Sequence, residues 1–169
     1  MNPFACTLHA ELDVDASAEE VWAVLVDHAA YPRWNPVVVR VRGELRVGAR
    51  AVETVRTDRG RELTFRSRVL VVDRPHELVR RGRLLLPGVF TGVHRYRLDA
   101  RGGGVRVVQS ERLTGVLVPF LRRRLTTQSQ AQFRAVNAAL ARRVAELRGA
   151  ATDPEPHVEQ RAVPAPRAE

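Results

Sequence analysis

Near the N-terminus the chain contains the stretch Ser17-Ala18-Glu19-Glu20-Val21-Trp22, which has the pattern of a helix start. Ser17 is a favourable N-cap residue, and Glu20 follows three positions later, so we expect the two to form a capping box. An apolar stripe of helical spacing then continues to Val26, which predicts a short amphipathic helix. The next motif, Tyr31-Pro32-Arg33-Trp34-Asn35-Pro36, holds two prolines and indicates a turn or a second, broken helix.

Extended segments lie on both sides of these short helices. One strand is expected before them, over residues 4–14. Six more are expected after them, separated by turn signals: residues 37–42, 49–57, 62–72, 77–85, 89–98 and 105–114. From Pro119 to about Leu147 apolar side chains recur with helical spacing, which predicts a long amphipathic helix. This order predicts an α+β fold, in which a mostly antiparallel seven-stranded sheet buries one face against the long helix.

The two N-terminal motifs and the element order resemble the SRPBCC or START-like helix-grip superfamily, and within it the polyketide cyclase/dehydratase-like family. Further similarity lies in residues 87–96, in Gln109-Ser110-Glu111-Arg112 and in the final helix, so the resemblance covers about residues 5–148. The resemblance implies a curved sheet wrapped around the terminal helix, with an elongated cavity between them. It also implies a ligand of the polyketide, lipid or aromatic kind, but fold alone does not choose among the functions of such proteins.

The composition bounds the remaining possibilities. The chain has 169 residues, of which 28 are basic and 19 acidic, and every basic residue is arginine. Residues 150–169 contain four prolines and no aromatic residue, and we expect a disordered tail of net charge −2. The domain, residues 1–149, therefore carries a net charge of +11. Such a charge attracts polyanions non-specifically, but aromatic residues make up only 5% of the chain, so we expect no specific nucleic-acid partner.

Other classes of protein and site are excluded by simple counts. A single cysteine, Cys6, cannot form an internal disulfide and is expected to be an inert core residue. The five histidines show no paired ligand spacing, so we expect neither a metal nor a cofactor. No apolar run approaches the length of a membrane span, and no signal peptide is visible. We therefore expect a cytoplasmic monomer or homodimer whose partner is a hydrophobic small molecule.

The two-residue period of a strand separates inward from outward side chains. Most strand arginines fall on the outward face. A small polar set falls inward, together with Phe65 and Phe90: Glu53, Ser67, His94, Tyr96, Gln109 and Glu111. In the long helix, Gln128 or Ser129, and Gln132, interrupt the apolar stripe beside Phe133. Burying such polar groups unpaired costs about 1–3 kcal/mol each, so they must bond one another, water or a ligand.

The hairpin between the last two strands has two possible registers. A two-residue turn at Gly102 and Gly103 places His94 opposite Glu111, and Tyr96 opposite Gln109. A four-residue loop from Ala100 to Gly103 places His94 opposite Gln109 instead. Both registers bring these polar side chains within cross-strand reach.

Two interpretations remain open for each of these residues. His94, Glu111 and Tyr96 are candidate catalytic groups, because a carboxylate near His94 would fix its tautomer and stabilise its charged form. The alternative is that His94 and Tyr96 are core groups with satisfied hydrogen bonds, and that Glu111 pairs with an arginine near the cavity rim. Trp34 and Asn35 are expected to cap the cavity mouth as ligand contacts, unless Asn35 only caps the turn before Pro36.

Three functions follow as hypotheses. The first is an enzyme that binds a hydrophobic small molecule and cyclises or dehydrates it by acid/base chemistry without a metal. The second is a non-catalytic carrier or sensor of an apolar ligand. The third is a co-chaperone-like protein-interaction module, which a filled core would favour.

Overall fold

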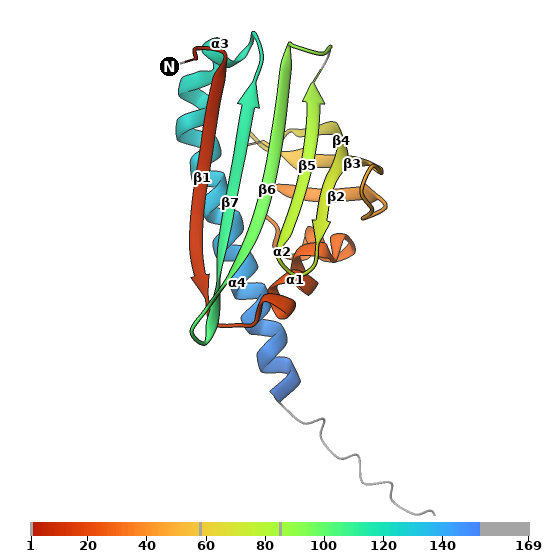
Figure 1. Cartoon of the computed structure of the whole chain (residues 1–169), viewed down its shortest axis with the longest axis vertical. Helices are drawn as coiled ribbons and strands as arrows, with labels where there is room; N and C mark the ends of the chain where they lie inside the picture. The colour runs from red at the N-terminus through yellow and green to blue at the C-terminus, as the bar shows by residue number, and fades with distance from the viewer. Residues whose placement is uncertain (1, 58, 85, 153–169) are drawn as a thin grey trace, which may run out of the picture.

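The computed structural model describes residues 2–57, 59–84 and 86–152 and confirms the predicted α+β architecture (Figure 1). After strand β1 (Ala5–Val14) come helix α1 (Ala18–Val26), a 3₁₀ turn (His28–Ala30) and helix α2 (Tyr31–Trp34). Six strands follow, and each is paired antiparallel with its neighbours: β2 (Val38–Gly43), β3 (Arg50–Arg56), β4 (Glu62–Asp73), β5 (Glu77–Leu84), β6 (Phe90–Arg101) and β7 (Gly104–Thr114). The order of strands in the single sheet is β1-β7-β6-β5-β4-β3-β2.

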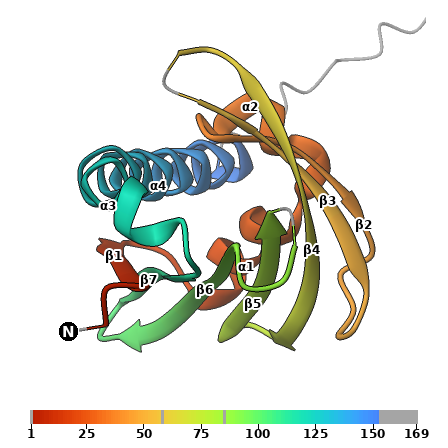
Figure 2. The same ribbon diagram turned by 90° about the horizontal axis from the view of Figure 1, so that it is seen from above.

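The C-terminal helical region consists of three consecutive parts. Helix α3 (Val118–Arg124) leads into a π-helical segment (Leu125–Ser129), and helix α4 (Gln130–Thr152) follows. Within this stretch the hydroxyls of Thr126 and Thr127 donate to the carbonyls of Arg122 and Arg123, over 3.0 and 2.8 Å. The sheet curves around these helices (Figure 2). Helix α4 extends past the predicted end at Leu147 and includes the first residues of the predicted tail, whereas residues 153–169 lie outside the described residues.

Local sequence signals explain the N-terminal elements. The amide of Glu20 donates to Oγ of Ser17 (3.3 Å), and the amide of Ser17 donates to the Glu20 carboxylate (2.7 Å), so the capping box is confirmed. Helix α1 then buries Val21, Trp22 and Leu25. These side chains pack in one cluster with residues of the β6–β7 hairpin, such as Leu98 and Val105, and with Leu140 and Val144 of α4. A second cluster, which includes the predicted core residue Cys6, joins β1 and the end of β7 to Val118 of α3 and Phe133 of α4.

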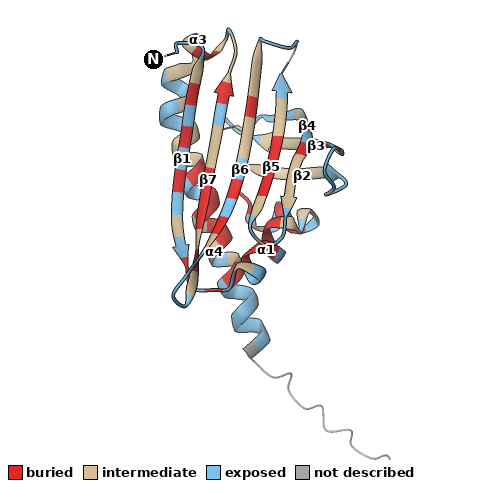
Figure 3. Cartoon of the chain, in the orientation of Figure 1, coloured by how far each residue is buried: buried red, intermediate tan, exposed pale blue. Residues whose placement is uncertain are grey.

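Buried and exposed residues alternate along the second half of β6, as the two-residue period predicts, whereas β7 buries Val107, Val108 and Gln109 in succession (Figure 3). The alternation breaks in β4, where a bulge between Val69 and Val71 shifts the register by one residue. Val72 therefore lies opposite the buried Leu78 and packs against the core. An uninterrupted period of two along residues 62–72 predicts that Val71 faces inward with Val69, and this prediction is wrong because the period does not continue across a bulge.

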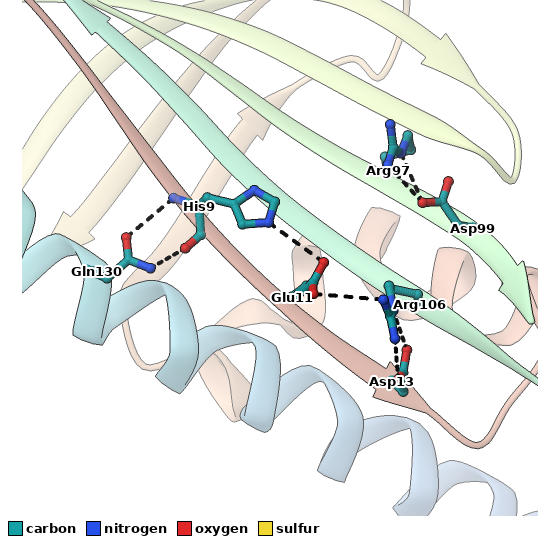
Figure 4. Close-up of polar contacts among 7 residues, drawn as sticks. All are labelled: His9, Glu11, Asp13, Arg97, Asp99, Arg106 and Gln130. Atoms are coloured by element: carbon teal, nitrogen blue, oxygen red, sulfur yellow. Dashed lines mark hydrogen bonds and ion pairs between the residues drawn. The ribbon is translucent and has the colours of Figure 1, made fainter.

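Several arginines on the outer face of the sheet, where most strand arginines were expected, form ion pairs. Arg106 binds Asp13 through two hydrogen bonds of 2.7 and 2.8 Å and lies 3.8 Å from Glu11 (Figure 4).

On the edge strand β1, the side chain of Gln130 from α4 hydrogen-bonds both the amide and the carbonyl of His9 (Figure 4). That contact satisfies part of an otherwise open strand edge. Within the described residues, no helix is both long and apolar enough to cross a membrane.

Candidate ligand cavity

A cavity of about 360 Å³ lies between the inner face of the sheet and the C-terminal helices. Its lining comes from β2 to β7, α3, the π-helical segment and the first turns of α4. Eleven of the predicted site residues line it: Glu53, Phe65, Ser67, Phe90, His94, Tyr96, Gln109, Glu111, Gln128, Gln132 and Phe133. The expected inward orientation of Glu53 is thus seen, with Ala51 buried on the same face and Val52 exposed on the other.

The turn at Gly102 and Gly103 sets which polar groups meet. Arg101 pairs with Gly104, so the loop has two residues, and Gly103 adopts φ +97°, a conformation that favours glycine. The resulting register places His94 opposite Glu111, and Tyr96 opposite Gln109. The alternative four-residue loop is therefore excluded.

His94 is held between two rings and one amide. Its ring stacks on Phe133, with centroids 5.3 Å apart, and lies 4.8 Å from the ring of Tyr96. The amide nitrogen of Gln109 donates to its Nε2 over 3.0 Å, so the ring proton belongs on Nδ1. Burial, and then the positive charge of Arg80, lower the pKa of His94 from 6.5 to about 3. The prediction that Glu111 stabilises a charged His94 is wrong, because burial disfavours the imidazolium and no hydrogen bond joins the two side chains among the described residues.

Glu111 is a carboxyl group without a hydrogen-bonding or ion-pair partner in the described part of the chain. Burial, and then the nearby charge of Glu53, raise the pKa of Glu111 from 4.5 to about 7. Gly92 on the neighbouring strand leaves room for this carboxyl group, because a Cβ at position 92 would lie 2.5 Å from Oε1 of Glu111. At neutral pH, Glu111 can therefore both accept and give a proton next to the cavity.

Arg80 on β5 is a cavity residue that the sequence-based set does not contain. Its guanidinium lies 3.6 Å from Oε1 of Glu53, which also accepts a 2.5 Å hydrogen bond from Ser67. A second Arg80 nitrogen lies 2.5 Å from Nε2 of His28, whose pKa is lowered to about 4 by burial and by the charge of Arg80. Neutral His28 is thus the acceptor. The sequence contains a pattern that predicts this position of Arg80, because Leu78, Arg80 and Gly82 lie on one face of a strand and Leu78 marks that face as inward.

Two buried polar atoms at the cavity have no hydrogen-bond partner among the described residues. They are Nε of Arg80, a donor, and Oε1 of Gln109, an acceptor. Tyr96 lies beside them, and burial raises the pKa of its hydroxyl well above 10, so it keeps its proton. The cavity therefore presents donors and an acceptor within a largely apolar lining.

Trp34 and Asn35 lie outside the cavity lining. Asn35 is buried, and its Oδ1 accepts from the amides of Val37 and Val38 over 3.0 and 2.8 Å, which is the turn-capping role. Trp34 packs against the core beside Tyr31, whose hydroxyl donates to the carbonyl of Leu25. The structure thus gives both residues structural contacts that fix α2.

The raised pKa of Glu111 predicts a dependence of stability on pH. Between pH 4.5 and about 7 the folded state binds more protons at this carboxyl group than the unfolded state does. The contribution of Glu111 to the free energy of unfolding therefore falls as pH rises through that window. We expect the Glu111→Gln variant to gain stability relative to the wild type from below pH 4.5 to above pH 7. Urea unfolding of both proteins across this range measures the difference, and a difference independent of pH would contradict the raised pKa. His94 is present in both proteins, so its opposite pH dependence cancels.

A curved antiparallel sheet wrapped around a long C-terminal helix, with a cavity between them that holds a few polar side chains, defines a helix-grip protein. A family model described as "Polyketide cyclase / dehydrase and lipid transport" matches residues 5–145. The chain therefore belongs to this family. No curated protein sequence matches the chain.

Solved structures share the fold at low sequence identity. The di-domain ARO/CYC StfQ from the steffimycin biosynthetic pathway superposes with a TM-score of 0.71 at 19% identity, over 88% of this chain and 53% of that one. The protein TTHA0849 from Thermus thermophilus gives 0.68 at 18% identity, over 88% and 100% of the two chains. A norcoclaurine synthase point mutant from Thalictrum, in complex with a transition-state analogue, gives 0.65 at 16% identity, over 85% and 96%. The chain spans about half the length of StfQ.

Proposed function

We propose that this protein binds a hydrophobic small molecule that carries carbonyl or hydroxyl oxygens and catalyses its cyclisation or dehydration without a metal. The ligand is of the polyketide, lipid or aromatic kind, and it occupies the cavity between the sheet and the helices. The observation that carries the proposal is Glu111, an unpaired carboxyl group with a pKa of about 7 at a cavity of about 360 Å³. Membership of the polyketide cyclase/dehydrase family supports the same class of reaction.

The polar groups suit a stepwise proton transfer. The Glu111 carboxylate removes a proton from the carbon next to a carbonyl, and the electron pair moves to the carbonyl oxygen as an enolate. The hydroxyl of Tyr96 and Nε of Arg80 are the donors available to that oxygen. When the enolate re-forms the carbonyl and expels a β-hydroxyl, Glu111 returns its proton to the leaving oxygen, so that water is released. His94, which is neutral, contributes a donor at Nδ1 and a flat surface rather than a charge.

Non-catalytic carriage of the ligand is the second candidate function. It is supported by the low pKa of His94, which removes one of the two expected acid/base groups at neutral pH. It is also supported by the self-contained cluster of Glu53, Ser67, Arg80 and His28, whose members already bind one another. A co-chaperone-like role is less well supported, because a filled core would favour it and this domain has a cavity of about 360 Å³. For either candidate we propose a cytoplasmic monomer or homodimer without a specific nucleic-acid partner.

Mass spectrometry separates the two candidates. The freshly purified protein is measured under native conditions, the co-purified ligand is extracted, and the extract is incubated again with ligand-free protein. We expect a bound hydrophobic molecule and, on incubation of the matching precursor, a mass lower by one water or an unchanged mass with a new ring. A ligand that is bound and released unaltered, with no conversion of any precursor, would favour the carrier. A protein that binds no small molecule would contradict both.

A further inference from the structure

One end of the molecule exposes several large apolar side chains. Phe120 is 84% exposed, Leu86 71%, Val116 54% and Phe4 51%. They belong to three segments: the residues before β1, the β5–β6 loop, and the β7–α3 connection with the first turn of α3. Exposed apolar groups gathered on one face of a protein commonly mark an interaction surface.

Backbone hydrogen bonds hold the three segments together. The amide of Gly115 donates to the carbonyl of Phe4 over 3.0 Å, and the amide of Val116 donates to the carbonyl of Gly88, also over 3.0 Å. The amide of Leu117 donates to the carbonyl of Val89 over 3.2 Å. The N-terminus, α3 and the β5–β6 loop accordingly lie together at the top of Figure 1. We call this surface the end patch: Phe4, Leu86, Val116, Phe120 and the arginines Arg122, Arg123 and Arg124.

The charge of the end patch has one sign. Residues 2–7, 83–92 and 113–125 contain four arginines and no aspartate or glutamate. From Arg112 to Ala145 the sequence has no acidic residue at all. On the outer face of β6 and β7, by comparison, arginines lie beside carboxylates, as in the ion pairs of Arg106 with Asp13 and Arg97 with Asp99. The end patch is therefore complementary to an anionic surface.

The end patch also lies beside the cavity. Leu84, Phe90, Leu121 and Arg124, which come from the same segments or directly adjoin them, line that cavity. A partner seated on the end patch would thus lie next to the ligand.

We propose that the end patch docks on the surface of an anionic lipid membrane, with Phe120 and its apolar neighbours inserted and the arginines at the level of the headgroups. Insertion of apolar side chains combined with attraction of cations to anionic lipid is the way interfacial proteins bind membranes. A lipid surface is favoured over an acidic protein because the apolar groups stand exposed on three separate segments. The inference goes beyond the proposed function, since it concerns where the ligand is exchanged and not what happens to it.

The test is sedimentation of the full chain with vesicles of phosphatidylcholine mixed with phosphatidylglycerol, and with vesicles of phosphatidylcholine alone. We expect binding to the anionic vesicles and about ten-fold weaker binding by Phe120→Ser, from the apolar area no longer inserted. Arg123→Gln should weaken binding about five-fold. The matched controls are Leu147→Ser, exposed at the other end of the molecule, and Arg66→Gln, exposed on β4; both should bind like the wild type.

A second readout reports insertion directly. In Phe120→Trp, tryptophan emission should shift to shorter wavelength when anionic vesicles are added, by more than in the wild type. Equal binding by Phe120→Ser and the wild type, or equal loss in both serine variants, would overturn the proposal and leave only non-specific attraction of a basic protein. Failure to bind anionic vesicles, with capture of an acidic protein through the same residues, would overturn it as well. Ligand binding in the cavity should be unchanged in Phe120→Ser, so the proposed function is tested separately.

Discussion

Replacing Arg80 by methionine is expected to lower the free energy of unfolding by about 3–5 kcal/mol, because it leaves the buried Glu53 carboxylate without its cation. The Arg80 and Glu53 side chains are only 11% and 17% exposed, so water does little to replace the lost partner. Methionine keeps most of the side-chain volume, which confines the effect to charge and hydrogen bonding. Urea unfolding of the wild type and the variant measures the loss.

Two further variants isolate the cause. Arg81→Met, at the next position of β5, should cost far less, because Arg81 takes the opposite face of the strand. The double variant Arg80→Met/Glu53→Gln should recover part of the stability, since it removes the stranded charge as well. The charge of Arg80 also lowers the pKa of His94, so NMR titration of Arg80→Met should show a higher pKa at His94. A stability loss as small as that of Arg81→Met would contradict a buried, structurally required ion pair.

Replacing Glu111 by glutamine is expected to reduce turnover of the substrate by about 10²–10⁴-fold, the usual contribution of a positioned general acid or base. Glutamine retains the shape of the side chain but cannot carry the proton. Ligand affinity should change much less than turnover, because the apolar lining is intact. Steady-state rates measured with the precursor identified by mass spectrometry, together with ligand affinity, give the two quantities.

Two comparisons complete this test. Glu146→Gln changes a carboxylate on the exposed face of α4, outside the cavity lining, and should leave turnover unaffected. Gly92→Ala places a methyl group 2.5 Å from Oε1 of Glu111, closer than contact allows, and should also slow the reaction by displacing that carboxyl group. If Glu111→Gln turned over at the wild-type rate, Glu111 would not be the acid/base group, and carriage would become the better account.

The sequence predicts the fold well because its signals are local. The capping box at Ser17 and Glu20, and the two glycines of the β6–β7 turn, act within a few residues, and both are confirmed. Strand alternation likewise predicts which side of β6 and β7 faces the helix. It fails at Val71, because the β4 bulge depends on pairing with β5 and leaves no signature within β4 itself.

The electrostatics of the cavity are less predictable from sequence. Alternation brings His94 and Glu111 to opposite positions, but their protonation depends on burial and on Arg80, a residue 14 positions before His94. Asn35 illustrates a different limit, since an asparagine before a proline fits a ligand contact and a turn cap equally well until its hydrogen bonds are known.

We propose that a hydrophobic ligand occupies the space between the sheet and the long helix. Titration with 1-anilinonaphthalene-8-sulfonate tests it directly when the wild type is compared with two variants of one helix. Gln132→Phe fills the cavity, whereas Arg134→Phe adds the same side chain at an exposed position of α4. We predict about ten-fold weaker binding for Gln132→Phe, a loss of about 1.4 kcal/mol, and wild-type affinity for Arg134→Phe. Equal affinity in all three proteins would contradict a ligand site in this cavity.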